Sequence, residues 1–138
     1  MSNVKRVVLS FGLVGMALLC VACPPVLHIM LYNNTGTNIS VHVAETTYSL
    51  STGSSTRVSP ETSPWLTISD GGKTLKYDIS KFGLPSEYFK PVWNGRLVQF
   101  QIQPDWRIYI LKPDVVMPLQ EMPSQPPGFP LIPTTDMK

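Results

Sequence analysis

The chain has 138 residues, with eleven Lys or Arg against nine Asp or Glu and a formal net charge of +2. This length is sufficient for one domain with an ordinary hydrophobic core. The basic residues form no cluster that could follow a phosphate backbone, so the sequence predicts no nucleic-acid partner.

The amino-terminal end has the layout of a secretory signal. Lys5 and Arg6 give it a positive start, and residues 7–19 are almost entirely apolar. Such a signal has a charged region, an apolar run of about 7 to 15 residues and small residues at the cleavage site. A membrane-spanning helix needs about 20 apolar residues, but Pro24 and Pro25 would stop a helix before that length. The pattern therefore predicts export with removal of the leader rather than a permanent spanning helix.

The leader ends in a short motif made of Val21, Ala22 and Cys23. It resembles the end of the lipobox of bacterial lipoprotein precursors, in which a small residue directly precedes the cysteine. The resemblance implies that the Cys23 thiol receives a diacylglyceryl group and that signal peptidase II then cuts between Ala22 and Cys23. Cys20 departs from the pattern, because it occupies the position where Leu is usual, and it would leave with the leader, residues 1–22.

Two other roles for the cysteine pair are disfavoured. A Cys-x-x-Cys half-site for zinc needs two further ligands, and only His28 and His42 are available. A redox pair needs a helix amino end after it to lower a thiol pKa, whereas two prolines and an extended apolar run follow here.

The processed chain would be a neutral, lipid-anchored protein. Loss of Lys5 and Arg6 leaves nine basic and nine acidic residues in a chain of 116 residues (138 less 22). One acyl chain gives only marginal membrane binding, while the several chains of a mature lipoprotein hold it stably. Pro24 stands where Asp would favour the inner membrane, so the resemblance implies the outer membrane, with the protein facing the periplasm.

Alternation of apolar and polar residues dominates the rest of the chain, as in half-buried strands. Leu75 and Tyr77, for example, flank Lys76 in a strand that follows the turn sequence Asp-Gly-Gly-Lys. Weaker strand signals lie at 47–50 and 55–58. We expect three hairpins, formed by residues 26–32 with 37–44, 65–69 with 74–80, and 97–103 with 107–111.

These patterns predict an all-β domain over residues 23–112. No long window has the helical period, fourteen prolines interrupt the chain, and one helical turn is expected at 86–89. Short antiparallel strands with one apolar face must cover that face. We therefore expect a small antiparallel β-sandwich or a partly open barrel of about 6–8 strands.

Residues 113–138 form a proline-rich extended tail. Pro127, Pro130 and Pro133 recur every third residue, the period of a polyproline II helix, with Phe129 among them. One hypothesis is that the tail is a stiff ligand for an aromatic groove on a partner. The alternative is a disordered end, or a strap across the protein's own sheet with Phe129 in the core.

Aromatic residues in two predicted loops are candidates for binding. Tyr88, Phe89 and Trp93 lie close together in the longest break between strands, and Trp106 lies at a hairpin tip. Exposed aromatic side chains on loops often mark binding surfaces, and these could stack on the sugar rings of peptidoglycan. The alternative is that they fold back and close an open end of the sandwich.

Chemistry-bearing motifs do not stand out. The chain contains no Gly-x-Ser-x-Gly, Ser-x-x-Lys, phosphate-binding glycine loop or His-Glu-x-x-His. Asp70 and Asp78 could pair for sugar hydrolysis, but a turn position and a solvent-facing position explain them better. We expect no catalytic residue, metal or cofactor, and no enzyme.

The sequence thus predicts a non-catalytic binding or assembly protein of the cell envelope, which contacts an envelope protein through its loops and tail. The alternatives are a module that binds peptidoglycan or another polysaccharide through exposed aromatics and, less favoured, a hydrolase.

Overall fold

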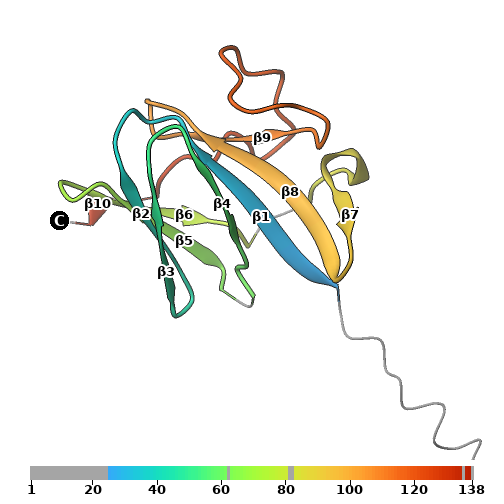
Figure 1. The fold of residues 1–138 in the computed structure, drawn as a ribbon, viewed down its shortest axis with the longest axis horizontal. Coiled ribbons are helices and arrows are strands. Elements are labelled where there is room, and N and C mark those ends of the chain that lie inside the picture. The colour runs from blue at the N-terminus through green and yellow to red at the C-terminus, as the bar shows by residue number, and fades with distance from the viewer. Residues whose placement is uncertain (1–24, 62, 81–82, 135, 138) are drawn as a thin grey trace, which may run out of the picture.

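The computed structural model describes residues 25–61, 63–80, 83–134 and 136–137. The predicted leader and the motif ending at Cys23 lie outside these residues. Two five-stranded sheets pack face to face and do not close into a barrel, so the predicted all-β sandwich is confirmed (Figure 1). Among the described residues the helical content is one 3₁₀ turn, η2 (Ser86–Tyr88), close to where a helical turn was expected.

The first sheet has the order β4-β1-β8, and two further strands, β7 and β9, pair with the other edge of β8. The second sheet has the order β10-β6-β5-β2-β3. The strands of the first sheet are β1 (Val26–Asn33), β4 (Ser55–Val58), β7 (Lys90–Val92), β8 (Gly95–Ile102) and β9 (Ile108–Leu111). The strands of the second are β2 (Ile39–Val43), β3 (Thr46–Leu50), β5 (Trp65–Ser69), β6 (Thr74–Asp78) and β10 (Asp136–Met137).

The core lies between the sheets and follows the alternation in the sequence. In β2, Ile39, Val41 and Val43 are buried while the residues between them are exposed. Complete burial of such a side chain contributes roughly 1.5–3 kcal/mol. The eight strands that alternation predicts are all present in the described chain. The two it does not predict, β7 and β10, are the shortest.

The predicted hairpins β5–β6 and β8–β9 are confirmed, but the first hairpin is wrong. β1 and β2 lie in different sheets, and β1 pairs antiparallel with β4 and parallel with β8. The physical cause is the corner that follows β1. The buried Asn33 side chain donates to the carbonyl oxygens of Thr37 (2.7 Å) and Leu50 (3.1 Å) and accepts from the Thr35 N–H (3.0 Å). These bonds turn the chain across the core instead of back along β1.

The parallel β1–β8 pair is the longest in the fold and requires a glycine at its start. The register runs from Val26 opposite Gly95 to Asn33 opposite Ile102. A Cβ atom on Gly95 would lie 1.9 Å from the carbonyl oxygen of Val26. The two backbones therefore approach as closely as they do because position 95 has no side chain.

The described part of the tail forms a strap on the sandwich, which was the alternative to a ligand for a partner. The fully buried Gln101 side chain donates to the Leu119 carbonyl (2.9 Å) and accepts from the Leu119 N–H (3.0 Å). Gln125 binds both backbone groups of Ile110 in the same way, at 3.1 and 2.9 Å. Proline has no N–H group to donate to a neighbouring strand. Here the side-chain amides of the two glutamines make hydrogen bonds that backbone groups would make between paired strands. β10 then joins the second sheet beside β6.

Candidate functional site

The sandwich has two ends with different chemistry. At the end where β1 begins, the β7–β8 turn lies beside Val26; we call this the N-terminal end (Figure 1). The opposite end collects the connections at 34–38, 51–54, 70–73 and 103–107; we call this the loop end. Of the residues that the sequence singled out, Trp93 lies at the N-terminal end and Trp106 at the loop end.

Trp93 is the most exposed aromatic side chain of the described chain, with 99% of its surface open to solvent. It occupies a tight turn that β1 holds in place. The N–H of Val26 donates to the Asn94 carbonyl at 3.2 Å. The His28 ring lies with Nε2 2.9 Å from Asn94 Oδ1 and Nδ1 2.9 Å from Ser59 Oγ. The turn is therefore tied to the sheet, and buried His28 is a structural residue within it.

The other three predicted aromatic residues are buried or half-buried. Tyr88 is 8% exposed and belongs to the core. Phe89 is half-buried, and the Arg96 guanidinium lies 4.9 Å from its ring centroid. Trp106 is half-buried, with Lys73 Nζ 3.9 Å from its ring centroid. They are not brought together with Trp93 into one aromatic surface.

The predicted proline edge of the tail is only partly open. Pro127 is exposed, whereas Pro130 and Pro133 are half-buried. Phe129 packs against the core, with its ring centroid 5.5 Å from that of Phe100. The three proline rings are therefore not equally available to a groove on another protein.

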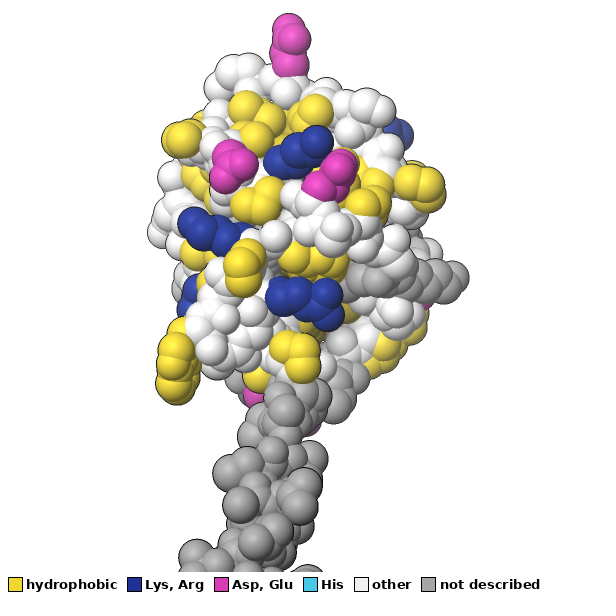
Figure 2. Space-filling model, turned by 90° about the vertical axis from the view of Figure 1, so that its right-hand side faces the viewer, with side chains coloured by type: hydrophobic (Ala, Val, Ile, Leu, Met, Phe, Trp, Pro, Cys, Tyr) yellow, Lys and Arg dark blue, Asp and Glu magenta, His cyan; other side chains and the backbone are white. Residues whose placement is uncertain are grey.

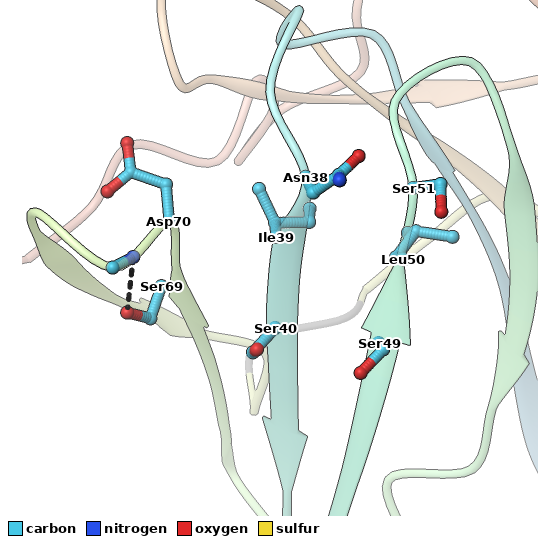
Figure 3. Close-up of a pocket in the computed structure, with 9 residues that line it drawn as sticks. Asn38, Ile39, Ser40, Ser49, Leu50, Ser51, Ser69 and Asp70 are labelled. Atoms are coloured by element: carbon cyan, nitrogen blue, oxygen red, sulfur yellow. Dashed lines mark hydrogen bonds between the residues drawn. The ribbon is translucent and has the colours of Figure 1, made fainter.

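A polar cleft of about 390 Å³ lies at the loop end, where the neighbouring ends of β2, β3 and β5 meet (Figure 3). The lining is mostly hydroxyl, amide and carboxylate, and consists of Asn38, Ile39, Ser40, Ser49, Leu50, Ser51, Ser69, Asp70 and Gly71. Sequence reasoning missed this cleft, because its serines come from the ends of three separate strands. The one local signal was the presence of serine at outward-facing positions of those strands.

Asp70 gives this cleft a fixed negative charge. Its Oδ1 accepts from the backbone N–H groups of Gly72 and Lys73, both at 2.9 Å. These two bonds stabilise the charged form and hold the pKa of the Asp70 carboxyl below its ordinary value of 3.8. The carboxylate therefore remains ionised at neutral pH, and Figure 3 shows it directed away from the labelled serine side chains of the cleft.

A second cleft of about 430 Å³ lies at the same end, between the β8–β9 turn and the strap. Its lining is also largely polar and consists of Asn34, Gln103, Pro104, Asp105, Tyr109, Gln120 and Met122. The loop end thus presents two shallow polar hollows formed by segments distant in sequence.

The carboxylates and histidines weighed for chemistry do not converge. Asp70 precedes β6 and Asp78 ends it, where its Oδ1 accepts from the Ser80 N–H at 2.9 Å. His28 is in the first sheet, while His42 is exposed in the second. Within the described ranges no three His, Cys, Asp or Glu side chains are grouped as a metal site would need.

No protein-family model, curated protein or solved structure matches this chain. In the part of the chain that the structure describes, no helix has the length and apolar character to cross a bilayer.

Proposed function

We propose that this chain is a lipid-anchored protein of the bacterial cell envelope with a non-catalytic binding or assembly role. Acyl chains on Cys23 hold it to a membrane, on the periplasmic side of the outer membrane. The loop end binds an envelope partner. The proposal combines the lipobox resemblance with the position of the polar clefts, which lie at the end of the sandwich opposite to the one where β1 begins.

One observation carries the anchoring part. The first strand begins at Val26, three residues after Cys23, and the first buried apolar residue of the described core is Ile29. Cleavage before Cys23 would therefore remove none of the described core. It would also leave the lipidated residue next to a folded strand, with almost no linker between them.

The position of the polar clefts supports binding at the loop end. β1 runs from the N-terminal end to the loop end, so both clefts lie at the far end of the strand from the proposed anchor. A protein held at Cys23 would turn these clefts away from the membrane. The Asp70 carboxylate and the serine hydroxyls that line the same cleft can each accept hydrogen bonds, which suits a partner that presents donors.

The anchor is tested by two single substitutions in cells. Cys23→Ser should abolish acylation and release the protein from the membrane fraction, because serine cannot form the thioether. Cys20→Ser is the matched control and should keep both properties. Incorporation of a labelled fatty acid and the intact mass of the purified protein are the measurements. Acylation of Cys23→Ser, or a wild-type mass that includes residues 1–22, would contradict the proposal.

The binding role is tested by cross-linking in cells that make the anchored protein. A photoactivatable benzoylphenylalanine at Ser51, in the polar cleft, should give a discrete cross-linked product after irradiation. The same group at exposed Glu45, in the β2–β3 turn at the other end, is the control and should not give that product. Equal products from both positions, or none from Ser51, would argue against a partner at the loop end.

A further inference from the structure

We infer that the N-terminal end of the sandwich rests on the lipid bilayer, with the Trp93 indole seated in the headgroup region. This inference depends on the proposed anchor at Cys23 and adds a second, non-covalent membrane contact made by the folded domain itself. The occupant of this surface is therefore lipid.

The covalent reach of the chain places the turn near the membrane. Val26 is three positions after Cys23, and a fully extended chain spans at most about 3.6 Å per residue. Val26 therefore lies within roughly 11 Å of the lipidated residue. Val26 is opposite Gly95 in the sheet, and its N–H donates to Asn94. The Trp93 turn is thus next to the point at which the chain passes from the lipid anchor into the folded domain.

The side chains at this point suit a membrane interface. Trp93 is 99% exposed and Val26 is 38% exposed, although both are large apolar residues. Tryptophan is enriched at membrane–water interfaces because its ring is apolar and its N–H can still reach a polar partner. Without a covering surface, the Trp93 indole would be fully hydrated beside the anchor.

Basic residues on the same hairpin are placed to meet lipid phosphates. Lys90 and Arg96 are both exposed, and residues 90–97 contain no Asp or Glu. Figure 2 shows the side of the molecule that carries β7, where Lys and Arg side chains lie among hydrophobic ones and Asp and Glu side chains are also present. Cations near an anionic bilayer surface add to the attachment that apolar groups provide.

The turn is held in this orientation before any contact is made. His28 of β1 holds the Asn94 side chain, with Nε2 of the ring 2.9 Å from Asn94 Oδ1. The other ring nitrogen, Nδ1, is held by the Ser59 hydroxyl. A preorganised group loses less conformational freedom on binding than a mobile one. Trp93 therefore projects from a turn whose neighbouring residue, Asn94, is held by hydrogen bonds to β1.

The test uses the full protein with its native acyl anchor, reconstituted in vesicles of phosphatidylethanolamine and phosphatidylglycerol. Phospholipids brominated in the upper part of their acyl chains quench tryptophans that enter the bilayer. The protein has three tryptophans. We expect quenching and a blue-shifted emission in the wild type, loss of most of both in Trp93→Phe, and retention of both in the matched control Trp106→Phe. Trp106 lies at the loop end, away from the bilayer.

The outcomes separate this inference from the proposed function, because the intact mass of the same samples reports whether Cys23 is acylated. Acylated wild type that is quenched no more than Trp93→Phe would overturn the membrane contact and leave the anchor standing. Unmodified Cys23 would overturn both. An indole that stays hydrated in vesicles but is shielded on adding peptidoglycan would also overturn the inference, because the surface would then bind carbohydrate. Circular dichroism of each variant would show that loss of quenching is not loss of folding.

Discussion

Replacing Gly95 with alanine should destabilise the domain by about 3 kcal/mol, the upper end of the usual cost of overpacking. The added Cβ would lie 1.9 Å from the Val26 carbonyl oxygen and 2.7 Å from the Val26 carbonyl carbon and nitrogen. These are backbone atoms in the longest strand pair, so they cannot move away as a flexible side chain would. The strands must separate at their start, where the Trp93 turn is also held. Urea unfolding followed by circular dichroism measures the loss.

Gly83→Ala is the matched control for this prediction. No atom would lie within 4 Å of a Cβ at position 83, so its free energy of unfolding should match that of the wild type. If Gly95→Ala unfolds within about 0.5 kcal/mol of the wild type, which is typical of a neutral surface change, the close approach of β1 and β8 is not present in solution.

Phe100→Ala should lower the free energy of unfolding by about 3–5 kcal/mol, the usual cost of removing a buried phenylalanine. Phe100 is a fully buried member of the core, and Phe129 of the strap packs against it. Phe129→Ala should cost less, because Phe129 is only half-buried. The ring centroids are 5.5 Å apart at an interplanar angle of 57°, so the double variant should show a coupling energy of about 0.5–1.5 kcal/mol.

This coupling tests whether the tail is part of the folded domain. Strictly additive effects of the two substitutions would mean that the strap does not pack on Phe100 in solution. Pro127→Ala is the control, because Pro127 belongs to the same segment but is exposed. Its free energy of unfolding should be close to that of the wild type. All variants are compared by urea unfolding under the same conditions.

The two ends of the sandwich give the proposed function a physical arrangement. Gly95 allows the close parallel pairing of β1 with β8. This pairing places the Trp93 turn beside Val26, where the first strand begins. The strap helps to form one polar cleft at the other end, through Gln120 and Met122. If the proposed function holds, the tail would contribute to the partner surface as a folded element that lines a cleft, rather than as the free polyproline ligand considered from the sequence.

Local patterns correctly predicted the hairpins whose strand faces and turns are defined by residues close together in the chain. In β5–β6, alternation marks the buried face and Asp70 stabilises the turn through two bonds within three residues. The turn of β8–β9 is equally local, since Asp105 accepts from the Arg107 N–H at 3.0 Å. Such elements can be predicted because every contact that defines the turn is near in the chain.

Distant contacts decided what alternation cannot reveal. Alternation shows which face of β1 is buried, but not that β8 and β4 are its neighbours or that Asn33 turns the chain into the other sheet. The same limit applies to the aromatic residues. Trp93 and Trp106 are both turn tryptophans in the sequence, and only the fold places Lys73 of the opposite sheet over one of them.

By itself, then, the sequence determined the all-β class, the eight longer strands with their inward faces and two of the three expected hairpins. These depend on side-chain period and turn chemistry within a few residues. The tertiary structure alone decided the parallel β1–β8 pair, the binding of the tail to the sandwich and the isolation of Trp93 at the N-terminal end. The physical reason is that each of these is a contact between segments far apart in the chain, and its energy comes from packing and hydrogen bonds that no short stretch contains.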